Sequence, residues 1–258
     1  GIHVTASNAN NCSGYSTSAL GIYGLNAVLN NCTGRSDGGN GMEVTTSTLN
    51  GCVGYSTSSS GIYDTNCVVS NSKGHSTAGN GYTSLFNNTT YRNKTNVSGY
   101  SAAIDGMYLG GRVHAQGCSG YSTVQNGLQV GDQEASFPVT YGNPILNGCS
   151  GMSSAGPGIS IGKQSNTSTI SILNCTATST WNSIAGYAIS SIGSATSGTI
   201  IANTTCTVAN SGAYAINVAA AETIKYISNI FIGSTTPLDP LITQAVINTQ
   251  DNQGNILV

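Results

Sequence analysis

Residues 41–60 read GMEVTTSTLNGCVGYSTSSS, and this 20-residue unit decides the fold of the chain. Related units occupy residues 1–20, 21–40 and 61–80, so that successive rows begin GIHV, GIYG, GMEV and GIYD. The pattern continues in rows of uneven length that start at Gly81, Gly106, Gly127, Gly158 and Gly186. A repeat this regular indicates a solenoid built from stacked coils.

The start of each row has the order glycine, apolar residue, any residue, apolar residue. This period of two is typical of a strand with one buried face. The pairs expected to point inward are Ile2 and Val4, Met42 and Val44, Met107 and Leu109, Leu128 and Val130, and Ile159 and Ile161. A row of this length is too short for a strand–helix–strand unit of about 30 residues, but it has room for two or three short strands. The sequence therefore predicts an all-β fold, a right-handed, single-stranded parallel β-helix with about 20–30 residues per coil.

Stacked coils place equivalent side chains in columns. An apolar column is expected from Leu29, Leu49, Val69 and Leu146. A polar ladder is expected from Asn10, Asn30, Asn50 and Asn147, with Ser70 at the same place. Asparagine tolerates the left-handed backbone conformation, so the ladder is predicted to occupy a sharp corner of the coil. The leading glycine is predicted at another corner, where a positive φ or a close approach is needed.

The rows lengthen after residue 81. The row from Gly81 has 25 residues and the row from Gly127 has 31, and the added residues include 87–93 and 132–143. Insertions in a solenoid become loops on one face, which is often the binding face.

The repeat is lost near residue 213. We therefore expect residues 1–212 to form the parallel β-helix, and residues 213–258 to form a final coil with a capping or oligomerising segment. The open end of a solenoid exposes strand edges and core, and needs such a cap. The apolar residues expected to lack a coil that buries them include Ile227, Ile230, Phe231, Ile242 and Val246.

Most of the eight cysteines share one place in the rows. That column consists of Cys12, Cys32, Cys52, Cys118, Cys149 and Cys175. A free cysteine packs as a small apolar residue, so a column of reduced, interior thiols is the favoured interpretation. Disulfides remain open, because the distance between adjacent coils does not forbid them. A metal site is not expected, because the chain has no CxxC or HxxxH spacing, and no cofactor is expected either.

The composition excludes some partners. Charged residues make up only 6% of the chain, against about 25% in ordinary soluble domains. The seven lysines and arginines form no basic run, and the net charge is −2, so nucleic acid is not an expected partner. No apolar stretch reaches the roughly 18–20 residues of a membrane span, so membrane insertion is not expected.

Two outward columns contain most of the candidate binding residues. The first consists of His3, Tyr23, Glu43, Tyr63, Thr83, Tyr108 and Gln129. The second consists of Tyr15, Arg35, Tyr55, His75, Tyr100 and Tyr121. A tyrosine offers an apolar ring with a polar tip, which suits a sugar ring, so the seven tyrosines of the two columns are the candidate glycan-binding residues. The alternative is that they stack on one another or pack against a neighbouring subunit.

Carboxylate pairs are scarce. Hydrolysis of a glycosidic bond needs two carboxyl groups at about 5–9.5 Å. Asp132 and Glu134 lie together in the longest row, and Asp105 precedes Gly106. Glu43 and Asp64 come from neighbouring rows, although at non-equivalent positions. Lys94, Arg92 and Arg112 are the cations that a lyase could use. Solvated loop residues are the simpler interpretation of Asp132 and Glu134, and the sequence favours glycan binding over catalysis.

The GIxV…NCxGYST rows, the low charge and the break before the C-terminal segment resemble bacteriophage tailspike and tail-fibre proteins. Their parallel β-helices are related to the pectate-lyase fold. The resemblance implies a homotrimer at the virion tail, assembled in the host cytoplasm, that attaches to bacterial surface polysaccharide. It supplies no catalytic motif that maps onto a residue of this chain.

Three functional hypotheses remain. The first is a receptor-binding domain of a phage spike or fibre, and the second is a polysaccharide hydrolase or lyase. The third is a structural or ice-binding solenoid, for which a regular threonine array is expected. Thr17, Thr57, Thr77 and Thr123 recur, but Asp37 and Ala102 interrupt them.

Overall fold

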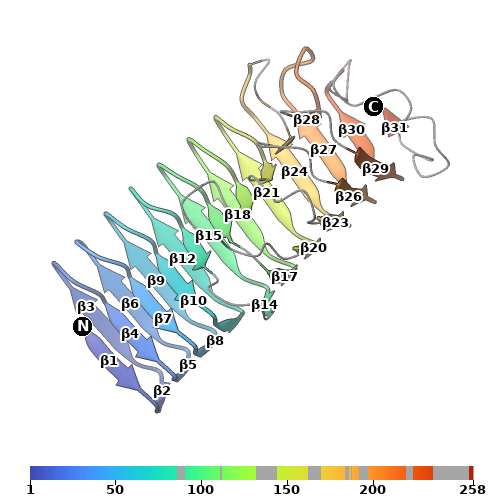
Figure 1. Ribbon diagram of the computed structural model, residues 1–258. Helices are drawn as coiled ribbons and strands as arrows, with labels where there is room; N and C mark the ends of the chain where they lie inside the picture. Colours follow the sequence, from blue (N-terminus) through green and yellow to red (C-terminus); the bar gives the residue numbers. More distant parts are fainter. Residues whose placement is uncertain are drawn as a thin grey trace.

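The computed structural model describes most of the chain. The described residues are 1–85, 91–110, 112–131, 144–161, 170–183, 186, 188–191, 197–218, 223–234 and 256–257. They form strands, turns and bends without a helix, and none of their segments is a helix that could span a membrane. Figure 1 shows the strands stacked coil upon coil along one axis from the N-terminus to the C-terminus.

The strands belong to three parallel sheets, named A, B and C in the order in which the chain visits them. Sheet A consists of β1 (Ile2–Thr5), β4 (Ile22–Leu25), β7 (Met42–Thr45), β10 (Ile62–Thr65), β13 (Tyr82–Leu85), β16 (Met107–Leu109), β19 (Leu128–Val130), β22 (Ile159–Ile161), β25 (Ile189–Ser191) and β28 (Ile216–Val218). Sheet B consists of β2 (Asn8–Asn10), β5 (Val28–Asn30), β8 (Thr48–Asn50), β11 (Val68–Ser70), β14 (Arg92–Thr95), β17 (Val113–Gln116), β20 (Ile145–Asn147), β23 (Ser171–Leu173), β26 (Ser197–Ala202) and β29 (Thr223–Ile227). Sheet C consists of β3 (Ser13–Ser16), β6 (Thr33–Ser36), β9 (Val53–Ser56), β12 (Lys73–Ser76), β15 (Ser98–Ser101), β18 (Ser119–Ser122), β21 (Ser150–Ser153), β24 (Thr176–Ser179), β27 (Thr205–Val208), β30 (Ile230–Ile232) and β31 (Ile256–Leu257).

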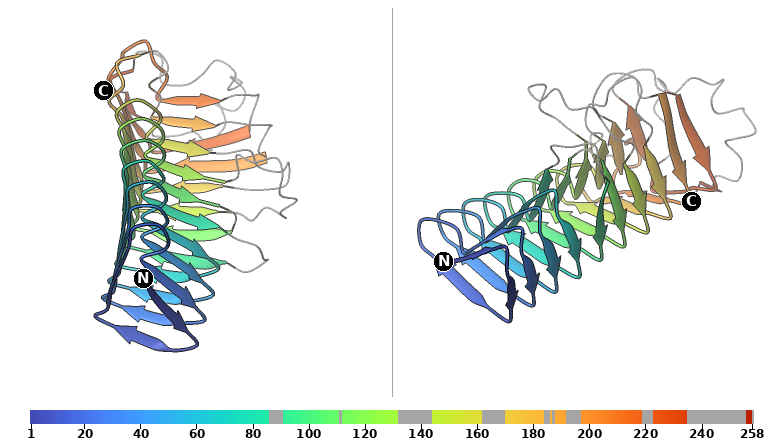
Figure 2. Two further views of the ribbon diagram at one scale, coloured as in Figure 1. Left: turned by 90° about the vertical axis from the view of Figure 1, so that its left-hand side faces the viewer. Right: turned by 60° about the horizontal axis from the view of Figure 1, so that its bottom comes forward.

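The fold is therefore the right-handed parallel β-helix that the repeat predicts. Each strand pairs with its copy in the next coil, as Ile22 does with Met42 and Met42 with Ile62. The two views of Figure 2 show the three sheets running side by side along the axis.

The in-register pairing continues through the longer rows, with one register shift between Ser197 and Thr199 in the pairing of β26 with β29. The residues added in the rows from Gly81, Gly127 and Gly158 fall between β13 and β14, β19 and β20, and β22 and β23. Each of these junctions leads from sheet A to sheet B, so the insertions share one corner of the coil, as expected from the solenoid.

Most of the residues predicted to point inward are buried in the structure. The row-start residues are buried, except Ile2 in the first coil, which is half-buried. The Leu29, Leu49, Val69 and Leu146 column is also buried. Further residues share this column, among them Lys94, which pairs with Val69 on one side and with Ala115 on the other. Lys94 has no exposed surface.

The asparagine corner prediction needs correction, whereas the leading glycines show the close approach that was one of their two expected causes. The left-handed residues lie one position after the expected asparagine ladder, at Asn11, Asn31, Asn71, Asn96, Asn174 and Asn203, with glycine at 51, 117 and 148. A second left-handed column holds Ala6, Asn26, Thr46 and Asn66. The expected ladder instead ends the strands of sheet B, where Asn30 Nδ2 donates to Asn10 Oδ1 at 2.9 Å. The leading glycines do not have a positive φ; they are required by a close approach, because a Cβ on Gly21 would lie 2.4 Å from the backbone nitrogen of Arg35.

The coil continues beyond residue 212. Strands β28, β29 and β30 extend sheets A, B and C by one further coil, in which Phe231 is buried and Ile227 is half-buried. The expectation that these two residues lack a coil to bury them is wrong. Ile242 and Val246 lie outside the described residues.

Candidate functional site

The outward face of sheet C presents two parallel columns of side chains. Its strands β3, β15 and β18 read Ser-Gly-Tyr-Ser, and successive side chains point to opposite faces. The glycine and the second serine therefore point inward, while the first serine and the tyrosine point outward.

The inward residues hold this face in place. At Gly99, a Cβ would lie 2.0 Å from the carbonyl oxygen of Gly106, so sheet C packs directly against the start of the next coil of sheet A. The inward serines join adjacent coils: Ser56 Oγ donates to the carbonyl oxygen of Gly39 at 2.7 Å and accepts from the backbone N–H of Ser59 at 2.8 Å. The outward tyrosines thus stand on a rigid backbone.

The aromatic rings of the second outward column stack on one another. His75 and Tyr100 have ring centroids 4.6 Å apart and an interplanar angle of 13°. Tyr100 and Tyr121 have centroids 5.3 Å apart at 20°, and Tyr55 is tilted by 48° against His75 at 5.8 Å. The row of Tyr55, His75, Tyr100 and Tyr121 is called the aromatic ladder below. The stacking raised as an alternative in the sequence analysis is therefore present.

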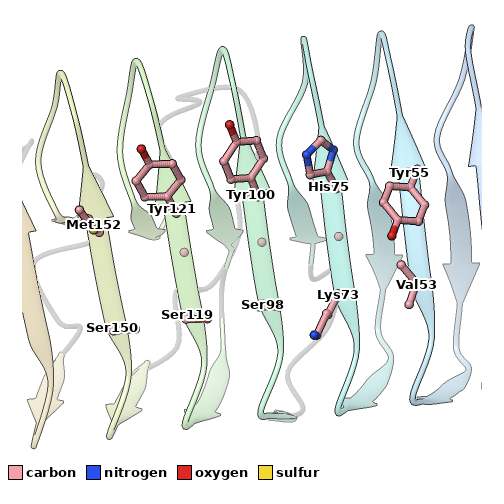
Figure 3. A pocket seen from close by; sticks show the side chains of 13 residues that line it. Val53, Tyr55, Lys73, His75, Ser98, Tyr100, Ser119, Tyr121, Ser150 and Met152 are labelled. Carbon is pink, nitrogen blue, oxygen red and sulfur yellow. The ribbon is translucent and has the colours of Figure 1, made fainter.

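The aromatic ladder forms one side of a shallow groove of about 450 Å³. In Figure 3 the four rings stand in one row, with Met152 continuing the row at β21. The other side is formed by the residue two positions before each ring or Met152, which is also outward-facing on sheet C. These residues are Val53, Lys73, Ser98, Ser119 and Ser150. The groove follows the helix axis over β9, β12, β15, β18 and β21.

The groove combines apolar surface with hydroxyl groups. Tyr55 is 44% exposed and Met152 is 41% exposed, while the rings of Tyr100 and Tyr121 are half-buried. The Tyr121 hydroxyl lies 3.2 Å from Ser154 Oγ. Ring edges, hydroxyl groups and one ammonium group are thus the chemistry that the groove offers to a ligand.

Tyr15 lies on the same sheet but outside the groove. Its hydroxyl donates to Asp37 Oδ2 at 2.5 Å, and the guanidinium carbon of Arg35 lies 5.7 Å from its ring centroid. The hydrogen bond to Asp37 raises the pKa of Tyr15.

The first predicted column lies on sheet A and forms no part of the groove. Tyr23, Tyr63 and Tyr108 are half-buried there, and the ring of Tyr23 meets that of His3 edge-on at 4.7 Å. Thr83 and Gln129, from the same column, are buried. The seven candidate tyrosines are therefore divided between two sheets, and Tyr55, Tyr100 and Tyr121 are the three that share the groove.

Asp105 is buried in the turn between β15 and β16. Its Oδ1 accepts from the backbone nitrogen of Asn126 at 3.1 Å and from Asn126 Nδ2 at 2.9 Å. Burial raises the pKa of Asp105 to about 6, against the lowering effect of these hydrogen bonds. The turn contact gives Asp105 a structural partner, and Asp105 does not line the groove.

The other carboxylate candidates do not form a described pair. Glu43 points outward from sheet A, where Asn40 Nδ2 donates to it at 2.9 Å. Asp64 points into the solenoid and is fully buried, so it does not project outward from its row as Glu43 does and the two carboxylates form no surface pair. Asp132 and Glu134 lie outside the described residues. Within the described part of the chain, no cluster of three or more His, Cys, Asp or Glu residues could hold a metal ion.

The three cations that a lyase could use, Lys94, Arg92 and Arg112, lie away from the groove. Lys94 is buried in the solenoid interior, where it cannot reach a surface ligand. Arg92 begins β14 of sheet B, and its backbone nitrogen donates to Arg112 in the next coil at 3.3 Å. None of the three lines the groove.

Sequence reasoning missed half of the groove. It identified the aromatic ladder but not Lys73, Met152 or the outward serines. The signal was available, since these serines precede each tyrosine by two residues and so share its face.

Known proteins offer little guidance on this chain. No family model matches the sequence, and no curated protein matches it. A similar solved structure is the A-module of the mannuronan C-5 epimerase AlgE6 from Azotobacter vinelandii, which is 10% identical with a TM-score of 0.48. The match covers 94% of this chain and 77% of that one. A similarity this weak gives no information about the ligand or substrate of this chain.

Proposed function

We propose that this β-helix binds a glycan along the groove of sheet C. The observation that supports the proposal is the aromatic ladder with the hydroxyl groups of Ser98, Ser119 and Ser150 beside it, all on the outward face of sheet C. Tyrosine supplies a large contact area at low entropic cost, and its hydroxyl can bond a sugar. Serine hydroxyls both donate and accept hydrogen bonds, which matches the hydroxyl groups of a saccharide.

The repetition of the groove supports a polymeric ligand. Adjacent coils lie about 4.8 Å apart, so each coil adds one pair of outward side chains to the groove at short intervals, and β15 and β18 carry the same serine–tyrosine pair. A chain of sugars running along the axis would meet similar surroundings at several consecutive units.

The finer form of the proposal is attachment of a bacteriophage to its host. In this form the chain belongs to a homotrimeric tail spike or fibre, is assembled in the host cytoplasm, and binds bacterial surface polysaccharide. The resemblance of the GIxV…NCxGYST rows to tailspike and tail-fibre proteins supports it. Competition by the purified protein for phage adsorption to host cells tests it, and a protein without affinity for host cells contradicts it.

The central test is binding of capsular polysaccharides and lipopolysaccharides from a panel of bacteria. Replacement Tyr100→Ala removes the middle of the aromatic ladder and is expected to lower affinity about tenfold or more. The matched control is Tyr63→Ala, which removes an equally half-buried tyrosine from sheet A, outside the groove. Equal losses in the two variants, or no binding to any glycan, would refute the proposal.

Cleavage of the bound glycan is the second hypothesis to be tested in the same experiment. The described carboxylates Glu43, Asp64 and Asp105 lie outside the groove, which favours binding alone. Release of oligosaccharides that is lost in Asp132→Asn or Glu134→Gln would identify a depolymerase instead.

A further inference from the structure

The groove carries positive charge in a protein that is weakly acidic. Lys73 is exposed on β12, and His75 follows two residues later on the same face. The described residues that line the groove include no carboxylate, although the chain as a whole has a net charge of −2.

The described acidic residues are engaged elsewhere. Asp64 and Asp105 are buried, and Glu43 belongs to sheet A. Asp37 follows β6 and accepts the hydrogen bond of Tyr15, outside the groove lining. Lys73 is therefore held next to the aromatic ladder without a described acid among the lining residues, which leaves its ammonium group available to a ligand.

We infer that the groove selects a glycan whose sugars carry carboxylate groups. The inference rests on the proposed function and names the class of ligand within it. An ammonium group has three donors and no acceptor, and its strongest hydrogen bonds are to ionised oxygens. A neutral sugar would leave that charge uncompensated, whereas a carboxylate-bearing sugar would neutralise it.

The geometry allows both contacts at once. Lys73 and His75 are two residues apart on one strand, a separation of about 7 Å along β12. One unit of the polymer can therefore rest on the aromatic ladder while a carboxylate lies beside the Lys73 ammonium group. The outward serines of β15 and β18, Ser98 and Ser119, continue the Lys73 column and remain available to the hydroxyl groups of the next units.

Matched polymers test the inference directly. The probes are polygalacturonate, hyaluronan and polysialic acid, each paired with its carboxyl-reduced, neutral form. We expect at least one acidic polymer to bind more tightly than its neutral form, and added salt to weaken that binding, because the lysine is exposed and screened. Lys73→Gln is expected to lower affinity for that acidic polymer about five- to tenfold, and to leave affinity for the neutral form unchanged.

Two controls separate a specific contact from general charge. Lys73→Arg keeps the charge and is expected to retain most of the affinity. Arg92→Gln removes one positive charge from sheet B and is expected to have no effect. Thermal melting of each variant checks that it is folded. Because the Lys73 side chain is exposed, its replacement is expected to leave the melting temperature unchanged.

The outcomes distinguish this inference from the proposed function. Equal binding of acidic and neutral polymers, or equal losses in Lys73→Gln and Arg92→Gln, overturns the inference and leaves glycan binding in place. If no polymer of either kind binds, and none of the bacterial glycans binds, both the inference and the proposed function are refuted.

Discussion

At the scale of single residues, a salt bridge in the solenoid interior is expected to have a large effect on the free energy of unfolding. Lys94 Nζ lies 2.9 Å from Asp64 Oδ1, and both side chains are fully buried. Lys94 also donates to the carbonyl oxygen of Cys67 at 2.7 Å, and Asp64 accepts from Ser84 Oγ at 3.1 Å and from the Tyr82 hydroxyl. Asp64, Tyr82 and Ser84 belong to sheet A, Cys67 lies in the A-to-B turn, and Lys94 belongs to sheet B, so the cluster joins two coils across the interior.

Removal of one partner should be far more damaging than removal of the whole cluster. Lys94→Leu leaves the Asp64 charge buried and unpaired, and is expected to cost about 3–5 kcal/mol of the free energy of unfolding. The triple variant Asp64→Val, Lys94→Leu, Tyr82→Phe should recover most of that loss, because it replaces the charges with the residue types found elsewhere in their columns. Urea unfolding measures the free energy of unfolding of Lys94→Leu and of the triple variant. A triple variant no more stable than Lys94→Leu alone would contradict this account.

Asp105 should make stability depend on pH. Because burial raises its pKa from 3.8 to about 6, the folded protein holds this proton more tightly than the unfolded chain does. The contribution is complete below about pH 3.8 and is lost as the pH rises through about 6, with a total change of up to about 3 kcal/mol. Asp105→Asn keeps an oxygen that can accept from Asn126 and removes the charge.

The variant Asp105→Asn is therefore expected to be more stable than the original protein at pH 7, and no more stable at pH 3.5. The comparison is made by urea unfolding at both pH values, so that other titrating groups cancel between the two proteins. A stability difference that does not change with pH would show that Asp105 is not buried as described.

At the scale of the strands, glycine determines how closely the sheets approach. The inward glycines of sheet C face the start of sheet A with no room for a side chain. Gly99→Ala places a methyl group 2.0 Å from a backbone oxygen and is expected to cost several kcal/mol, because backbone on both sides has to move. Ser98→Ala, the outward neighbour, is the control and should alter stability by less than about 0.5 kcal/mol. Thermal melting that shows equal effects would argue against the close packing.

The cysteine column is the second element-scale feature. All eight cysteines are free, and all but the half-buried Cys12 are buried. Burial raises the pKa of Cys52 to about 11 and the pKa values of Cys67 and Cys206 to about 12, which suppresses the reactive thiolate form.

Thiol titration is therefore expected to detect one fast-reacting group in the native protein and eight after denaturation without reductant. Cys12→Ser should abolish the fast reaction and leave the slow ones. A denatured count near zero would establish disulfides instead.

At the scale of the whole molecule, the solenoid is a sum of coils that each contact only their neighbours. The terminal coil formed by β28, β29 and β30 buries Phe231 and leaves Ile230 exposed, and the sequence after residue 234 contains further apolar residues such as Ile242 and Val246. We expect a homotrimer whose contacts include the residues after 234.

Light scattering tests this expectation on two chains. The full chain should have about three times the mass of the 26.1 kDa monomer, and a chain ending at residue 234, which keeps the last complete coil, should be monomeric. A monomeric full chain would contradict both the trimer and the phage-spike form of the proposed function.

The sequence by itself determined the coil, the inward and outward faces, the thiol column and the aromatic ladder. These follow from a repeat of fixed period and from the alternation of side chains along a strand, which are local properties. The tertiary structure alone decided that the outward side chains of five coils combine into one groove, and that Lys94 meets Asp64 in the interior. The physical reason is that these contacts join different coils, and their register depends on how rows of unequal length stack, which only the folded chain defines.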